Sequence, residues 1–349
     1  MHEVVKTGLF PLKNVWILFF ILLTFTLFWV DMAVGSVEIS FRNVLQILFS
    51  PRIDSSEWYT IHIFRFPRAI TALLAGIALS VSGLQMQTVF RNPLAGPYVL
   101  GISSGASLGV ALVVIGFGGY FAGNVFSLSG SWLLIIAACL GSAFVLVVIL
   151  AVSFRVRDVM TILILGIMFG SGISAIISIL QYFSAESALK AFVIWTMGSV
   201  SNVSREQLIV LLAGIIPGIV ITIFTLKPSN AILLGDNYAR TLGINIRNYR
   251  LLVFLSTSLL TGTITAFCGP IGFIGIAVPH ICRMIFQTSD QATLFIASIF
   301  VGSSLMLLSD IISQMPGSES ILPVNAVTSL IGIPVVVWII LRRKKVISS

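Results

Sequence analysis

Few side chains in this chain of 349 residues have the types and spacing that catalysis requires. The sequence contains no HExxH motif, and it contains no GxxxxGKS or GxxxxGKT phosphate loop, since none of its lysines follows a glycine. His280 and Cys282 stand close enough in sequence to suggest a metal site, but they follow Pro279 at a predicted helix bend. A structural hydrogen bond is the simpler role there. We therefore expect no metal site, no cofactor and no nucleotide site in this chain.

Charged side chains within apolar segments are the next candidates for function. Asp310 is the one acid deep in the second half of the chain, and an intramembrane carboxylate is a functional candidate by default. Its place near the outer end of a predicted span favours a structural role, as a cap for the short turn that follows. Arg65 and Arg68 precede an apolar stretch and mark one membrane surface.

The elements that carry these residues follow a route through a membrane. Residues 70–89 can cross a hydrocarbon core, and residues 91–98 break the helix with Pro and Gly on the far side. Gly101, Gly105 and Gly109 recur every four residues, so they line one face of the next helix. A neighbouring backbone can approach such a face closely.

Composition extends this interpretation to the whole chain. Hydrophobic residues make up 57% and charged residues 9% of it, and the mean hydropathy is +1.08, which excludes an ordinary soluble domain. Because a span needs roughly 20 apolar residues, there is room for about ten. We place them near 14–34, 66–88, 98–118, 131–153, 159–180, 204–225, 250–269, 271–286, 291–313 and 322–341. The first span has no small-residue cleavage site before Asp31, which favours an uncleaved helix over a signal peptide.

The basic residues predict the orientation. With both termini in the cytosol, 14 of the 20 lysines and arginines fall on the inner side, and the formal charge is about +10 inside and about −2 outside. This bias is typical of a multi-pass protein of the bacterial inner membrane. The net charge of +8 therefore reflects topology and lipid contact. No basic stripe with interleaved aromatic residues indicates nucleic-acid binding.

The longest polar stretch inside the chain lies at 227–250 and carries an excess of cations, which places it in the cytosol. Its pattern predicts two short helical turns, at 230–234 and 236–242, separated by Gly235 and closed by Gly243. Asp236 is expected to cap the second turn. A simple connection needs only a few residues, so this segment is expected to contact a partner. An amphipathic segment lying on lipid is the alternative.

Five motifs together resemble the FecCD/BtuC family of ABC transporter permeases. They are RFPR at 65–68, SGLQMQTVFRNPLAGPYVLGISSGA at 82–106, LLGDNYARTLGIN at 233–245, GPIGFIGIAVPHICR at 269–283 and LPVNAVTSLIGIPVVVWIILRR at 322–343. The resemblance covers nearly the whole length in the same order. It implies the transmembrane domain of a type II importer, residues 1–349 forming a single permease domain.

The resemblance also implies partners and roles. A second permease copy, two cytosolic ATPase subunits that hold ATP and Mg²⁺, and a substrate-binding protein are expected. The implied contacts with the ATPase are Leu234, Gly235, Asp236, Ala239, Arg240 and Gly243. The implied docking residues for the binding protein are Arg65 and Arg68, with Gln314 where many relatives have another arginine. Headgroup anchoring is the alternative for the two arginines.

Two further groups are assigned to the transport route. By resemblance, a cytosolic gate is formed by Asn92, Pro93 and Leu94 with Val159 and Met160; a purely structural turn is the alternative. The small-residue face with Gly166, Gly170, Ser174 and Ser178 is expected to line the pathway or to form a packing seam. The broken segments at 270–279 and 322–341 are expected to face the protein interior.

The implied function is import of a ferric siderophore, with cobalamin or haem as alternatives within the family. An ion-coupled secondary transporter is a remote alternative, because it would need embedded ionisable relays and Asp310 is thin support. An intramembrane enzyme is more remote, because no catalytic constellation lies within the spans.

Overall fold

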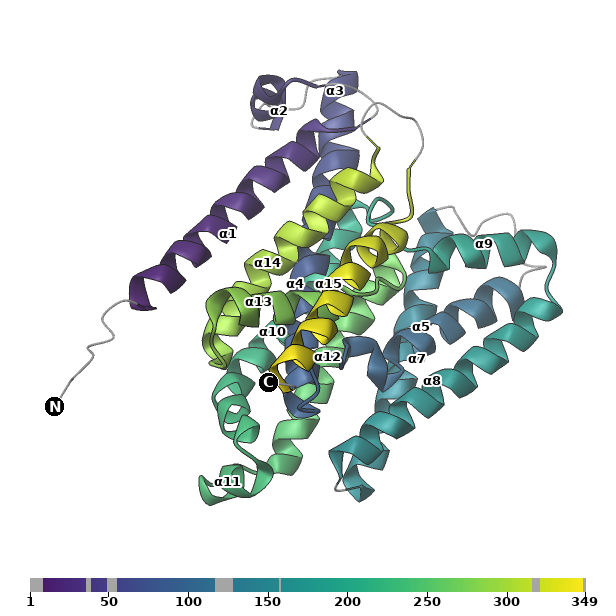
Figure 1. Cartoon of the computed structure of the whole chain (residues 1–349). Helices are drawn as coiled ribbons and strands as arrows, with labels where there is room; N and C mark the ends of the chain where they lie inside the picture. Colours follow the sequence, from purple (N-terminus) through teal and green to yellow (C-terminus); the bar gives the residue numbers. More distant parts are fainter. Residues whose placement is uncertain are drawn as a thin grey trace.

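Helices account for all the regular structure in the residues that the computed structural model describes, which are 9–35, 39–48, 55–116, 128–156, 158–315 and 321–347. The elements are α1 (Leu9–Ala33), α2 (Phe41–Leu48), α3 (Ser56–Tyr59), the π-helix η1 (Thr60–Arg65), α4 (Phe66–Val89), the 3-10 helix η2 (Pro97–Leu100), α5 (Ile102–Ala111), the π-helix η3 (Leu112–Gly116), α7 (Leu128–Arg155), α8 (Val159–Tyr182), α9 (Glu186–Thr196), α10 (Arg205–Leu233), α11 (Asp236–Thr241), α12 (Ile246–Cys268), α13 (Ile274–Phe286), α14 (Gln291–Ser313) and α15 (Val324–Ile347) (Figure 1). The predicted all-α class is confirmed.

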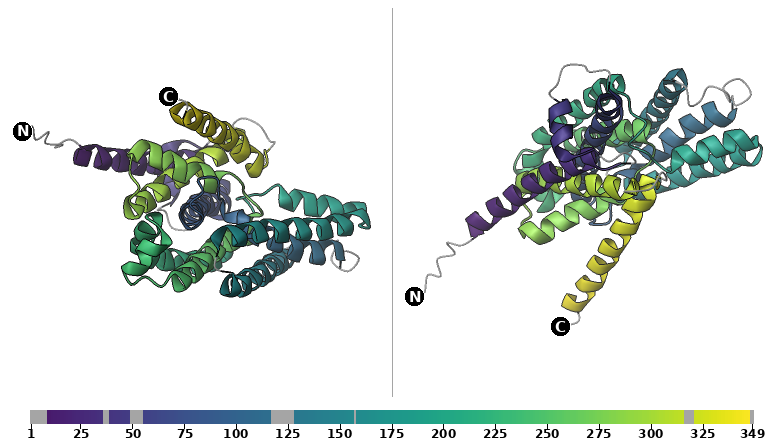
Figure 2. Two further views of the ribbon diagram at one scale, coloured as in Figure 1. Left: turned by 60° about the horizontal axis from the view of Figure 1, so that its bottom comes forward. Right: turned by 90° about the horizontal axis from the view of Figure 1, so that it is seen from above.

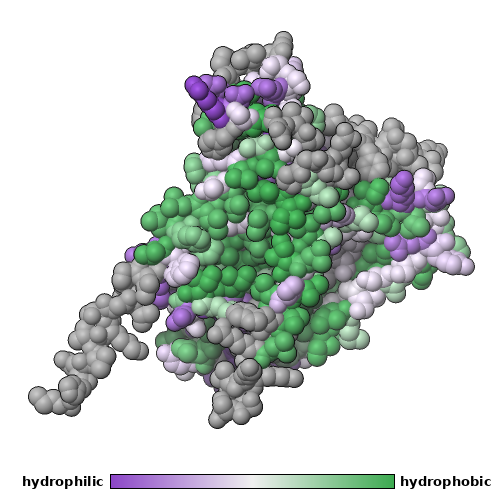
Figure 3. Space-filling view, turned by 45° about the horizontal axis from the view of Figure 1, so that its top comes forward, coloured by the Kyte–Doolittle hydropathy of each residue, from purple (hydrophilic) through white to green (hydrophobic). Residues whose placement is uncertain are grey.

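Within the described ranges, seven helices are long and apolar enough to cross a membrane. Three shorter apolar helices, at Ile102–Gly116, Ile274–Phe286 and Val324–Val337, coincide with the other predicted spans. Apolar side chains form a broad surface across the middle of the molecule (Figure 3). The chain is thus a multi-pass membrane protein, while the count of ten spans and the cytosolic termini stay predictions.

One predicted boundary is wrong. The span placed at 204–225 continues to Leu233, so the expected turn at 230–234 is the last part of α10 rather than a separate element. Pro228 lies inside this helix, and the hydroxyl of Ser229 donates to the Thr225 carbonyl at 2.7 Å. The helix therefore continues through the proline, which has no amide donor of its own.

Helix α4 lies in the centre of the bundle, against α10, α12, α13 and α14 (Figure 2). Its neighbours approach so closely that a Cβ at Gly76 would overlap the backbone of Gly302, and one at Gly83 would overlap the backbone of Gly275. Ser80 adds a hydrogen bond of 2.7 Å to the carbonyl of Ser298 in α14. Small residues and hydroxyl bonds therefore hold this centre together, as expected between helices in lipid.

The glycine face predicted at Gly101, Gly105 and Gly109 is confirmed at two of these three positions. A Cβ at Gly105 or Gly109 would overlap the backbone of α7 at Gly141 or Ala137. Gly101 instead has a φ of 73° and ends η2 in the left-handed region, which favours glycine.

The two broken segments, at 270–279 and 322–341, differ in how deeply they are buried. Helix α13 is mostly buried, and the amide of Gly272 just before it donates to Asn325 Oδ1 at 2.9 Å. The expectation of an interior position is therefore confirmed for α13. It is wrong for α15, which packs on α13 and α14 with one face only and leaves Leu330 and Ile333 exposed.

An ion pair joins α4 to α14 at the end of the molecule opposite α11. The Nε and Nη2 atoms of Arg68 donate to the two carboxylate oxygens of Asp310, each at 2.8 Å, and the Asp310 side chain is fully buried. Gln314 Nε2 donates to Asp31 of α1 at 2.7 Å and lies 3.4 Å from Asp310 Oδ2. Asp310 thus links three helices, and its expected role as a cap for the following turn is wrong.

Replacing Asp310 by alanine should destabilise the protein. The variant leaves the Arg68 guanidinium without its carboxylate at a site where that side chain is 12% exposed, a loss that typically costs about 3–5 kcal/mol. Thermal unfolding of the purified protein in detergent measures this effect. The double variant Arg68→Met with Asp310→Leu should recover part of the loss, because it removes both members of the pair, while the buried Asp31, which Gln314 also contacts, stays in place. Equal unfolding temperatures for Asp310→Ala and the wild type would contradict the assignment.

Candidate functional site

The polar segment predicted at 227–250 forms a compact projection at one end of the molecule (Figure 1). Helix α10 ends at Leu233, Gly235 follows with a φ of 122°, and the six residues of α11 lead to Gly243 with a φ of 80°. Both glycines therefore have backbone conformations that L side chains rarely adopt. They set the direction of α11, as their predicted positions between and after the turns require.

Asp236 opens α11 but does not cap it. The cap position belongs to Gly235, and no side chain makes a capping bond there. The Asp236 carboxylate instead pairs with Arg91, which follows α4, and with Arg250 of α12, whose Nη2 lies 2.8 Å from Oδ2. The predicted cap is wrong because two guanidinium groups, distant in sequence, occupy both carboxylate oxygens.

Apolar side chains cover the outward side of this projection. Leu234 is 70%, Tyr238 49% and Leu242 58% exposed. Tyr238 and Leu242 stand four residues apart and so lie along one side of α11, while Leu234 precedes the break at Gly235. Exposed apolar groups outside the lipid-facing band indicate a contact surface. Leu234 was among the contacts with the ATPase predicted from the sequence, but Tyr238 and Leu242 were missed. The four-residue spacing of these two residues could have indicated them.

The other residues predicted to contact the ATPase differ in their exposure. Arg240 and Gly243 are exposed, so a partner can reach them. Ala239 is fully buried within the chain, which contradicts a direct contact with a partner. Its small side chain permits α11 to pack closely on the rest of the protein.

A further contact fixes the base of the projection. Asn230 near the end of α10 donates to Asp290 Oδ1 at 3.0 Å and accepts from the Gln291 amide at 2.9 Å. Burial opposes ionisation of Asp290, but the bonds from Thr293 and Asn230 outweigh it and lower its pKa. The projection is thus held by α4, α12 and the start of α14.

The predicted gate residues lie near the same end of the molecule. Asn92 Oδ1 accepts from the Leu94 amide at 3.0 Å and so closes the elbow, the segment 91–98 that follows α4. Leu94 is 43% and Met160 46% exposed, while Pro93 and Val159 are half-buried.

Helix α8 carries two of the predicted gate residues, Val159 and Met160, in its first turn. The hydroxyl and amide of Thr161 donate to Asp158 at 2.7 and 2.8 Å, and these bonds lower the pKa of that carboxyl. The capping bonds fix the start of the helix that carries Val159 and Met160.

The small residues predicted to share one face of α8 lie in two different environments. Gly166 and Gly170 pack against the chain between η2 and α5, where a Cβ at Gly166 would meet the backbone of Val99. The packing alternative is therefore correct for these two glycines. Ser174 and Ser178 lie on the exposed side, and each hydroxyl bonds to a carbonyl of its own helix.

The outer arginines are already engaged within the chain. Arg65 Nη1 donates to the carbonyls of Met32 and Ala33 at 3.0 and 2.7 Å, and Arg68 holds Asp310. Gln314 is 7% exposed. A binding protein could use these groups only by replacing internal hydrogen bonds, so their docking role stays a prediction.

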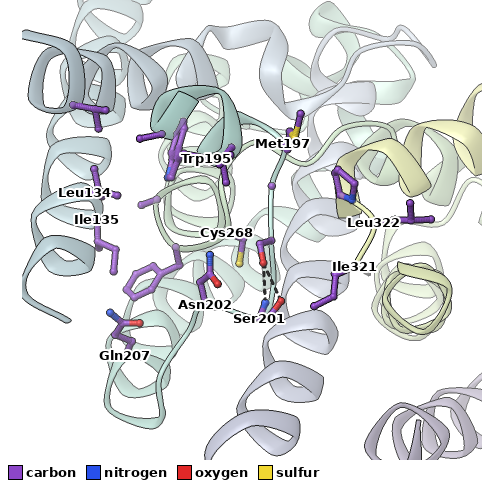
Figure 4. Close-up of a pocket in the computed structure, with 18 residues that line it drawn as sticks. Leu134, Ile135, Trp195, Met197, Ser201, Asn202, Gln207, Cys268, Ile321 and Leu322 are labelled. Atoms are coloured by element: carbon purple, nitrogen blue, oxygen red, sulfur yellow. Dashed lines mark hydrogen bonds between the residues drawn. The ribbon is translucent and has the colours of Figure 1, made fainter. Parts of the chain in front are cut away.

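A cavity of about 620 Å³ lies beside α9 and the end of α12. Figure 4 shows Trp195, Asn202, Gln207 and Cys268 around it, with the loop after α9 held by Ser199 and Ser201. No predicted site residue lines this space. Elsewhere in the described ranges, no group of three or more His, Cys, Asp or Glu side chains could hold a metal, and His280 and Cys282 form no such cluster.

Comparison with known proteins assigns the family. The chain is 33% identical over 315 residues to the hemin transport system permease protein HmuU of Yersinia pestis, covering 89% of this chain and 90% of that protein. It is 34% identical over 299 residues to the vitamin B12 import system permease protein BtuC of Klebsiella pneumoniae, covering 84% and 87%.

A solved structure agrees over a similar length. It shows an inward-facing conformation of a metal-chelate type ABC transporter, with a TM-score of 0.80 and 27% identity, and the match covers 93% of this chain and 98% of that one. The model of the FecCD transport family matches residues 21–342. This chain therefore belongs to the FecCD transport family.

Proposed function

We propose that this protein is the permease subunit of a type II ABC importer in the bacterial inner membrane. Two copies carry a metal chelate from a binding protein to the cytosol, and two separate ATPase subunits drive the cycle. This proposal rests on three exposed apolar side chains of the cytosolic projection, those of Leu234, Tyr238 and Leu242. Such a surface suits insertion into a groove of a motor subunit, and the sequence contains no phosphate loop of its own.

The ion-coupled alternative receives no support from the embedded charges. Asp310 is held by both guanidinium bonds of Arg68, so it is not free to carry a proton or an ion. ATP-driven transport by a partner is therefore favoured.

Uptake in proteoliposomes tests the proposed function. We expect accumulation of chelate only when the permease, its cognate ATPase, ATP and the cognate binding protein are all present. Uptake driven by an ion gradient without the ATPase would contradict the proposal.

The cargo is proposed as a class, with a ferric siderophore as the first candidate. Similar relatives are named for hemin and for vitamin B12, so haem and cobalamin are the alternatives. The same uptake assay with each labelled chelate and the same binding protein distinguishes the three.

Replacing Leu234 and Tyr238 by alanine should weaken association with the ATPase. Truncating two central apolar contacts of an interface typically costs about 2 kcal/mol or more, which corresponds to roughly 30-fold weaker binding. Binding of the ATPase to the detergent-solubilised permease measures the change. Ile216→Ala, at an exposed position in the middle of α10, is the matched control and should bind as the wild type does. Unchanged binding by the double variant would reject the docking surface.

The second copy is expected to lie against the exposed face of α8. This helix is long, apolar and mostly unburied within one chain, and its exposed Ser174 and Ser178 suit a wide pathway between two copies.

Cross-linking tests this arrangement. Ser174→Cys in a Cys139→Ala background should form a dimer linked by a bis-maleimide long enough to cross the pathway, because the exposed Cys139 is removed and the other two cysteines are buried. Ile216→Cys in the same background should stay monomeric on the gel. Equal cross-linking at both positions would indicate random collision in the membrane.

A further inference from the structure

The residue after the central helix has an unusual backbone conformation. Arg91 has a φ of 46°, in the left-handed region that residues with a Cβ seldom adopt. Its amide reaches the Thr88 carbonyl, and the next amide, of Asn92, reaches the Gln87 carbonyl. These two bonds form a Schellman cap, in which one left-handed residue ends a helix, so the end of α4 itself holds the backbone of Arg91.

The side chain of Arg91, by contrast, bonds to the cytosolic projection. Arg91 Nε donates to the carbonyl of Ile232 at 3.1 Å, and its Nη2 pairs with Asp236. One side chain thus connects the elbow to the end of α10 and to the start of α11. No other part of this elbow in the described structure makes an ion pair with the projection.

The second oxygen of Asp236 anchors the same carboxylate to α12. Arg250, with its side chain 13% exposed, donates to Oδ2 at 2.8 Å. Arg91 and Asp236 are 42% and 32% exposed, so solvent screens their pairing and it adds little to stability. The pairing instead fixes the orientation of the Arg91 guanidinium, because Nε and Nη2 donate to two different acceptors.

We propose that Arg91 is a positioning residue that transmits movement of α11 to the gate at Asn92, Pro93 and Leu94. The inference rests on the proposed function, because the ATPase is what displaces α11. When α11 moves, Asp236 and the Ile232 carbonyl move with it, and both pull on Arg91. The backbone of Arg91 is the start of the elbow, so the elbow follows without a separate signal.

The test separates ATP hydrolysis from transport in reconstituted permease with its ATPase and binding protein. Arg91→Ala should retain ATPase assembly and ATP hydrolysis, while chelate uptake per ATP falls at least about fivefold, as expected for loss of a coupling interaction. Arg91→Lys keeps the charge with fewer donors and should restore part of the ratio. Arg155→Ala removes an exposed cation at the end of α7 and should match the wild type.

A double-variant cycle assigns the effect to the pair. Once Asp236→Ala is present, adding Arg91→Ala should cause a clearly smaller drop in uptake per ATP than it does in the wild type, because only the bond to the Ile232 carbonyl is left to lose. A further drop of similar size would overturn the proposal, as would parallel losses of hydrolysis and uptake in Arg91→Ala. Absence of ATP-dependent uptake in the wild-type complex would instead reject the proposed function itself, so the two failures are distinguishable.

Discussion

The enclosure of α4 is the constraint on which the rest of this structure depends. Four helices pack around it, and in lipid such packing relies on close backbone approach rather than on the hydrophobic effect. Gly76 and Gly83 provide that approach, because any Cβ there would overlap the backbone of α14 or of the segment that opens α13. The positions of α13 and α14, and through them of α1 and α15, follow from these contacts.

The two ends of α4 are held by arginine and aspartate pairs of different character. At the outer end, Arg68 and a fully buried Asp310 form two hydrogen bonds, and loss of either partner would leave a buried charge. At the inner end, Arg91 and Asp236 are both partly exposed, so solvent can replace their contact at small cost. The outer pair therefore contributes to stability, while the inner pair mainly sets the orientation of the Arg91 side chain.

This arrangement relates the proposed partners to opposite ends of one helix. The end proposed to face the cytosol presents exposed apolar side chains on a turn held by ion pairs, which suits contact with a motor subunit. At the outer end the arginines expected to dock a binding protein satisfy the protein's own carbonyls and carboxylates. Docking there requires either exchange of these bonds or other exposed groups.

The sequence by itself determined the class of the protein and the positions of most of its helices. Apolar runs of the right length predict spans directly, since lipid accepts little else. The glycines that set the direction of α11 and the asparagine that closes the elbow were also readable, because their roles are local in the chain.

Only the tertiary structure decided which long-range partners each polar side chain meets. Asp236 has the local pattern of a helix cap but pairs with Arg91, which follows α4, and with Arg250 of α12, and Asp310 likewise pairs with Arg68. Ala239 and Gly166 carry suitable residue types on what prove to be buried faces. Residues far apart in the chain compete for the same hydrogen bonds, and that competition depends on distances in space that the order of residues does not contain.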